Sequence, residues 1–127
     1  MKTAIVRHSG RFVFVWATVI LVLCAMPGRF IPAAGWMDLL SLDKLVHAGV
    51  FFVLAALITV NVAVNSRSGG VYLASMAIAV IYGFVLEIMQ ATIFIDRSFE
   101  WTDAVANSFG VVVVGFIRAR LIRWIFG

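Results

Sequence analysis

Apolar residues occupy four long runs of the chain, and short polar stretches separate these runs. Apolar and polar positions do not alternate within these runs, whereas they would alternate in the strands of a barrel. The length of the runs is typical of membrane-spanning helices. Pro27-Gly28 stops the first run, Asp43 supplies a first-turn acid for the second helix, and Thr102 or Asp103 supplies a cap for the fourth. The sequence predicts four helices, at about 12–27, 43–64, 71–95 and 103–122.

The composition makes a lipid bilayer the expected solvent of this chain. Of its 127 residues 64% are hydrophobic, against roughly 45–50% in soluble domains, and the mean hydropathy is +1.10. We therefore expect one all-α integral membrane domain over residues 1–127, a bundle of four transmembrane helices. The first run also has the outline of a signal peptide, but Ala25-Met26-Pro27 is a poor cleavage site, and we interpret the run as a helix.

Basic residues near the helix ends predict the orientation, because cytoplasmic segments carry an excess of Lys and Arg. Seven of the ten Lys and Arg residues lie at the two termini and in the connector 65–70. The other three are Arg29, Lys44 and Arg97. We therefore expect both termini in the cytoplasm, with the connectors 29–43 and 96–102 outside. The net charge of +4 does not indicate a nucleic-acid partner, because these residues lie at the ends of apolar runs.

Polar residues within the predicted helices gather toward the outer membrane face. His47 lies in the first turn of the second helix, Glu87 and Gln90 lie in the outer part of the third, and Asn107 is one turn inside the fourth. At ~1.5 Å per residue, Glu87 lies ~7 Å outward of the middle of the third helix. An ionised carboxyl at the centre of a membrane helix costs ~2.5–3.5 kcal/mol, so Glu87 needs a partner, a proton or water.

Spacing along the helices predicts which polar residues share a face. Residues three or four apart lie on one face, as do Asp43 and His47, Glu87 and Gln90, and Asp103 and Asn107. Small residues let membrane helices approach closely, so the stripe that contains Glu87 is expected to face the interior. This stripe is Ser75, Ala79, Gly83, Glu87 and Ala91, and Ala106 and Gly110 play the same part beside Asn107.

This polar layer has two interpretations. It is either a structural hydrogen-bond network that fixes the packing of the helices, or the lining of a pocket open to the outside or to the outer leaflet. Arg97 above the layer would suit a phosphate or carboxylate. We expect no metal and no other cofactor, because His8 lies across the membrane from His47 and the single cysteine, Cys24, is mid-bilayer.

One combination of residues resembles a known family. Its elements are Asp43-Lys44-x-x-His47, Glu87-x-x-Gln90 and Arg97-Ser98-x-x-Trp101-x-Asp103-x-x-x-Asn107-x-x-Gly110. In this order, over about residues 25 to 117, they resemble the VanZ-like family of small bacterial membrane proteins. The resemblance implies a multi-pass protein of the bacterial cytoplasmic (inner) membrane and an association with resistance to the glycopeptide teicoplanin, but it implies no reaction. The polar positions that it carries over are Asp43, Lys44, His47, Glu87, Gln90, Arg97, Asp103 and Asn107.

Three functional hypotheses follow. In the first, the chain binds an anionic or polar headgroup of an envelope lipid or lipid-linked precursor. Arg97 and Lys44 would meet the negative group while Glu87, Gln90, His47 and Asn107 hydrogen-bond the rest. In the second, it is an enzyme that uses His47 or Glu87 as a general acid or base on an envelope substrate. In the third, it is a non-catalytic subunit with a membrane protein partner.

Overall fold

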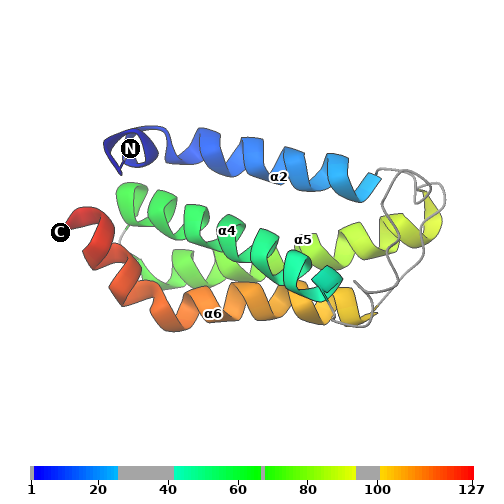
Figure 1. The fold of residues 1–127 in the computed structure, drawn as a ribbon. Coiled ribbons are helices and arrows are strands. Elements are labelled where there is room, and N and C mark those ends of the chain that lie inside the picture. The colour runs from blue at the N-terminus through cyan, green and yellow to red at the C-terminus, as the bar shows by residue number, and fades with distance from the viewer. Residues whose placement is uncertain (1, 26–41, 67, 94–100) are drawn as a thin grey trace.

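The computed structural model describes residues 2–25, 42–66, 68–93 and 101–127, and this part of the chain is almost entirely α-helical. Four long helices lie side by side, and a short helix precedes the first of them (Figure 1). They are α1 (Lys2–Arg7), α2 (Ser9–Ala25), α4 (Leu42–Asn65), α5 (Gly69–Thr92) and α6 (Trp101–Phe126). Consecutive long helices run in opposite directions, so the two chain termini lie at the same end of the bundle (Figure 1).

The middle two helices begin and end close to the predicted residues. The prediction for α4 differs from the structure by one residue at each end. α5 begins two residues before the predicted start, because the Ser68 hydroxyl caps it by accepting a hydrogen bond from the backbone N–H of Val71. It ends at Thr92, with Ile93 as its C-cap, and not at residue 95 as predicted.

The first and the last of the four long helices, α2 and α6, extend beyond their apolar runs. α2 already begins at Ser9, and its predicted end at residue 27 lies outside the described residues. α6 begins at Trp101, before the predicted cap, and continues to Phe126 instead of ending near residue 122. Its final turns carry arginines, whose charge is favourable near the negative end of the helix dipole. Hydrophobicity alone therefore misses the first residues of α2 and the last turn of α6.

α4 is the helix against which α2, α5 and α6 all pack. The approach between α4 and α6 is closest at Gly110, where a Cβ atom would lie 2.1 Å from the backbone oxygen of Ala48. No side chain fits there, so glycine permits this crossing. The predicted close approach at Gly110 is confirmed.

Apolar side chains cover the outside of the helices, while several polar ones are buried inside. On α5 the exposed large side chains include Leu73, Ile78, Ile81, Phe84 and Ile88. Glu87 and Gln90 of the same helix are each only 1% exposed. Among the described residues, Lys44–Asn65 of α4 and Gly69–Thr92 of α5 are long and apolar enough to cross a membrane, and α2 is apolar but shorter. An apolar outer surface around buried polar side chains is typical of a protein in contact with lipid.

Candidate functional site

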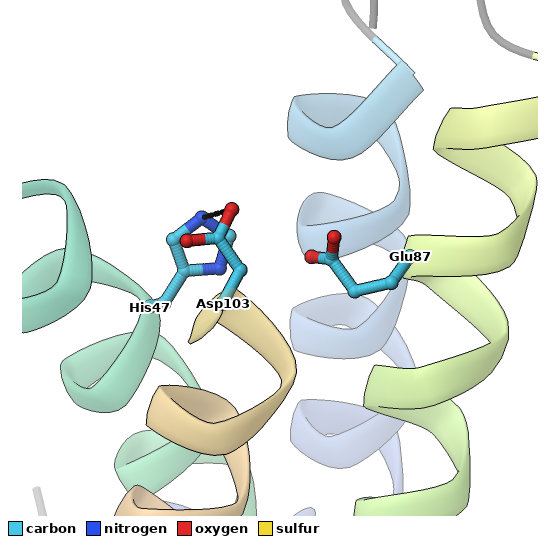
Figure 2. Close-up of side chains that lie close together, drawn as sticks. All are labelled: His47, Glu87 and Asp103. Carbon is cyan, nitrogen blue, oxygen red and sulfur yellow. Dashed lines mark ion pairs between the residues drawn. The ribbon is translucent and has the colours of Figure 1, made fainter. Parts of the chain in front are cut away.

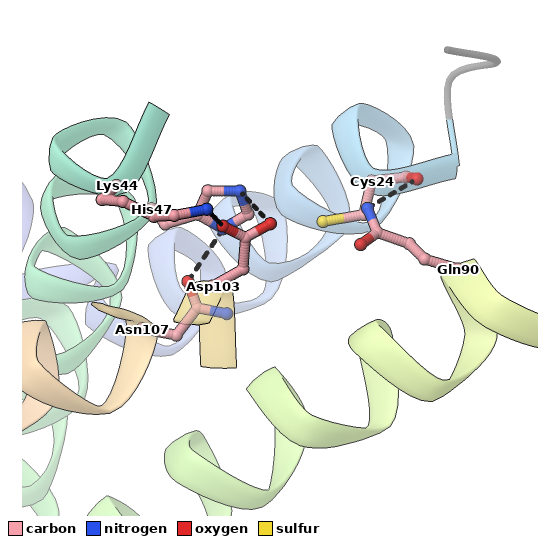
Figure 3. A network of polar contacts seen from close by, with 6 residues as sticks. All are labelled: Cys24, Lys44, His47, Gln90, Asp103 and Asn107. Carbon is pink, nitrogen blue, oxygen red and sulfur yellow. Dashed lines mark hydrogen bonds and ion pairs between the residues drawn. The ribbon is translucent and has the colours of Figure 1, made fainter. Parts of the chain in front are cut away.

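Five of the predicted polar residues come together where α4, α5 and α6 meet, at the end of the bundle opposite the chain termini (Figures 2 and 3). We call them the polar cluster: Lys44, His47, Glu87, Asp103 and Asn107. Gln90 lies next to the cluster on α5 and contacts α2. Arg97 and the side chain of Asp43, the two other predicted site residues, lie outside the described part of the chain.

Asp103 and His47 lie at the centre of the polar cluster. The Lys44 ammonium forms a salt bridge with Oδ1 of Asp103, and Nε2 of His47 lies 3.4 Å from Oδ2 of the same carboxylate (Figure 3). Nδ1 of His47 lies 3.0 Å from Oδ1 of Asn107. Because an amide oxygen only accepts hydrogen bonds, Nδ1 carries the hydrogen in this contact. The other ring nitrogen, Nε2, is thereby left facing Asp103.

Glu87 reaches the polar cluster from the opposite side. Its carboxylate extends from α5 toward His47 and Asp103, which come from α4 and α6 (Figure 2). One ligand atom each of His47, Glu87 and Asp103 lies within 4.8 Å of the other two. Glu87 is 1% exposed and Asp103 is 7% exposed. The prediction that Glu87 faces the interior is confirmed, and the site places two carboxylates against one histidine in a largely buried position.

Helix geometry and two glycines position the polar cluster. Asp103 and Asn107 are four residues apart and both contact His47, as their spacing predicts. Gly110, less than one turn beyond Asn107, brings α6 against α4. At Gly83 of α5 a Cβ atom would lie 3.3 Å from both Cβ and Nδ2 of Asn107. The absence of a side chain at Gly83 therefore leaves room for the amide that holds His47.

Gln90 serves a different contact from Glu87, although both are buried. Its Nε2 donates to the backbone oxygen of Cys24 at 3.2 Å, at the end of α2 (Figure 3). Three residues fall about 60° short of a full helical turn, so the Gln90 side chain points about 60° away from that of Glu87. This difference directs Gln90 from the polar cluster toward α2. The hydroxyl of Tyr82, two turns earlier, likewise donates to the oxygen of Ala17 at 2.6 Å. Gln90 thus helps to dock α2.

Charge in the polar cluster is unequal. With both carboxylates ionised and His47 neutral, Glu87 and Asp103 outnumber Lys44, the one cation among the five residues. Lys44 is engaged with Asp103 and is therefore a weaker candidate for an external anion than the sequence suggested. The cluster alone favours a cation, a proton donor or a polar group over a bare anion.

A separate apolar groove of about 340 Å³ lies between α5 and α6. Its lining includes Tyr72, Met76, Val111 and Phe116, and it contains none of the predicted site residues. The guanidinium of Arg118 lies over the Tyr72 ring, 3.8 Å from its centroid. This groove lies nearer the chain termini than the polar cluster does, and its apolar lining suits lipid chains.

The chain was compared with models of protein families, with curated proteins and with solved structures, and none of them matches. The resemblance to the VanZ-like family therefore stays a prediction from the residue pattern. Among the described residues, the geometry of the polar cluster is the observation that bears on function.

Sequence reasoning missed one property of the site. The expectation of no metal rests on the separation of His8 from His47 across the membrane and on the mid-bilayer position of Cys24. The structure instead brings one histidine and two carboxylates together from three helices. No short spacing motif reveals such a set, because its members lie far apart in the sequence. The predicted layer of His47, Glu87 and Asn107, together with the shared face of Asp103 and Asn107, is the one signal of this set in the sequence.

Proposed function

We propose that this chain is a VanZ-like protein of the bacterial cytoplasmic membrane that binds the headgroup of an envelope lipid or lipid-linked precursor. In this proposal the chain crosses the membrane four times, both termini are cytoplasmic, and the polar cluster lies toward the outer face. The observation that carries the proposal is the burial of Glu87, Asp103 and Asn107 beside His47 at the end opposite the termini. An association with glycopeptide resistance follows from the resemblance.

The nature of the buried groups favours a binding site over a purely structural network. Neutral side chains suffice to hold membrane helices together, and Gln90, Tyr82 and Trp16 already do so through bonds to backbone oxygens. Carboxylates are more expensive in a membrane and typically mark functional sites. Two carboxylates, a lysine and a histidine therefore exceed what packing requires.

Arg97 is the residue that we assign to the negative group of the headgroup. Lys44 is engaged with Asp103, whereas a guanidinium presents a planar set of donors that fits a phosphate or carboxylate. His47, Asn107 and Glu87 would hydrogen-bond hydroxyl or amide groups of the same ligand. This division of roles suits a headgroup that is both anionic and rich in polar groups.

Lipid binding by an Arg97→Ala variant tests this proposal. The purified protein, in a mild detergent, is mixed with an extract of envelope lipids, and bound lipids are identified by native mass spectrometry. The matched control is Arg120→Ala, which removes an exposed arginine near the carboxyl end. We expect a class of anionic lipid on the wild type and the control, and at least tenfold less on Arg97→Ala. Equal binding by all three proteins would contradict the proposal.

The contact between His47 and Asp103 favours a second candidate function, an acid/base enzyme. Asn107 fixes the orientation of the His47 ring, and Nε2 lies 3.4 Å from the Asp103 carboxylate. A histidine oriented in this way is suited to proton transfer. Turnover of the lipid extract, followed by mass spectrometry and lost in Glu87→Gln, would support the enzyme. Unchanged lipids after prolonged incubation with the wild type would exclude it for that extract.

A further inference from the structure

We propose that His47, Glu87 and Asp103 form a binding site for one divalent transition-metal ion. The three side chains come from α4, α5 and α6, and one ligand atom of each lies within 4.8 Å of the other two. Imidazole nitrogen together with carboxylate oxygen suits Zn²⁺ and Mn²⁺. This inference is independent of the headgroup that the protein binds.

The contact between His47 and Asp103 has the dimensions of a metal site. Nε2 and Oδ2 are 3.4 Å apart. Two ligands that each lie about 2.1 Å from a tetrahedral zinc ion are separated by about 3.4 Å. The Glu87 oxygen lies within 4.8 Å of the other two ligand atoms, and the proposal requires it to reach a similar separation of about 3.4 Å from each when the ion is bound. Two of the three ligands thus already have the required separation.

The hydrogen bonds around His47 prepare Nε2 for a cation. Asn107 accepts the hydrogen of Nδ1, so in the neutral ring the lone pair of Nε2 faces the Asp103 oxygen. Two lone pairs in contact repel each other, and a cation between them turns the repulsion into attraction. Histidine ligands of metals usually donate their other N–H to such a partner, which fixes the ring.

The Lys44 salt bridge and the burial of the two carboxylates also favour a metal ion at this position. Lys44 engages Oδ1 of Asp103 and leaves Oδ2 for the metal. With His47 neutral, the two carboxylates and Lys44 sum to one negative charge, and a divalent ion attracts both carboxylates and changes this sum to one positive charge. An anionic fourth ligand would offset that charge. Three protein ligands leave a coordination position open, as in catalytic rather than structural zinc sites. A phosphate oxygen of a headgroup, or a water molecule, would fit this position.

Metal titration of the full-length protein tests the site. The protein, without any histidine tag, is stripped with a chelator in detergent and titrated with Zn²⁺ and with Mn²⁺ by calorimetry. We expect saturation at one ion per chain for at least one of the two metals. That metal should also raise the melting temperature, since it binds the folded state. Co²⁺ in its place should give the visible absorption of a low-symmetry, nitrogen- and oxygen-ligated ion.

Three variants locate the ion. Glu87→Gln and His47→Gln keep the side-chain size and should weaken binding at least tenfold, whereas the matched control His8→Gln, in the segment between α1 and α2, should bind as the wild type does. Helical content by circular dichroism and a single peak in size exclusion show that each variant is folded. Lack of saturable binding by the wild type would overturn the proposal without using any variant. Equal affinities for Glu87→Gln and His8→Gln would also overturn it.

Discussion

Asn107 links the packing of the helices to the chemistry of the polar cluster. Its amide oxygen accepts from Nδ1 of His47 at 3.0 Å, and its side chain lies against Gly83 of α5. The residue is 2% exposed, so water cannot readily replace a lost contact. One amide thus contacts the other two helices of the site and determines which nitrogen of His47 faces Asp103.

We predict that Asn107→Ala lowers the free energy of unfolding by about 0.5–1.5 kcal/mol, the typical net contribution of a hydrogen bond within a protein. The change removes the acceptor for Nδ1 of His47. Equilibrium unfolding in mixed detergent micelles, followed by tryptophan fluorescence, measures this value. Ser108→Ala is the matched control, because within the described part of the chain the Ser108 hydroxyl bonds only to the Ala104 oxygen of its own helix. Equal unfolding free energies for the two variants would contradict the role of Asn107.

The composition of the polar cluster could be predicted, but its pairing could not. Helical spacing and a common depth in the bilayer placed His47, Glu87 and Asn107 in one layer. They could not show that Lys44 would engage Asp103, because this depends on how far α4 is rotated relative to α6. The same limit explains why Gln90, grouped with Glu87 by spacing, contacts α2 instead.

At the scale of helices, the crossing of α4 and α6 determines the geometry of the site. Gly110 has no side chain, and its backbone lies directly against the backbone around Ala48. His47 and Asn107 lie next to this crossing on the two helices. The small-residue spacing predicted the close approach, because small residues are the common means of close packing in membranes.

We predict that Gly110→Ala destabilises the protein by roughly 1–3 kcal/mol, the typical cost of overpacking. The new Cβ would lie 2.1 Å from the backbone oxygen of Ala48, and a backbone cannot move aside without separating the helices. Gly115→Ala, on the same helix, is the matched control, since a Cβ there meets no atom of residues 2–25, 42–66, 68–93 and 101–127 within 4 Å. Thermal unfolding in detergent should show a lower melting temperature for Gly110→Ala only. A decrease of equal size in both variants would contradict this account of the crossing.

At the scale of the whole molecule, the apolar outer surface and the polar interior favour a membrane location. The order and approximate lengths of the four long helices could be predicted, because apolar runs and turn residues mark them clearly. The carboxyl end of α6 could not, because arginines continue this helix beyond its apolar run. The antiparallel arrangement brings both termini to one end of the bundle (Figure 1), and their location on the cytoplasmic side stays a prediction from the basic residues.

Cysteine labelling tests the proposed orientation. In a Cys24→Ser background, Ser66→Cys marks the connector between α4 and α5, and Ala33→Cys marks the connector predicted to lie outside. A maleimide that does not cross membranes should label Ala33→Cys in intact cells and leave Ser66→Cys unlabelled. Both variants should react after the cells are permeabilised. The reverse pattern in intact cells would place the polar cluster at the cytoplasmic face and contradict a role in binding external headgroups.

The most direct test of the central claim, that the polar cluster is a binding site, is a crystal structure grown in a lipid mesophase containing envelope lipids. The account predicts ligand density within hydrogen-bond distance of His47 and Asn107, with the anionic part of the headgroup at Arg97. A closed cluster, in which the five polar side chains contact only one another and no ligand density adjoins them, would contradict the account. The cluster would then serve to hold α4, α5 and α6 together.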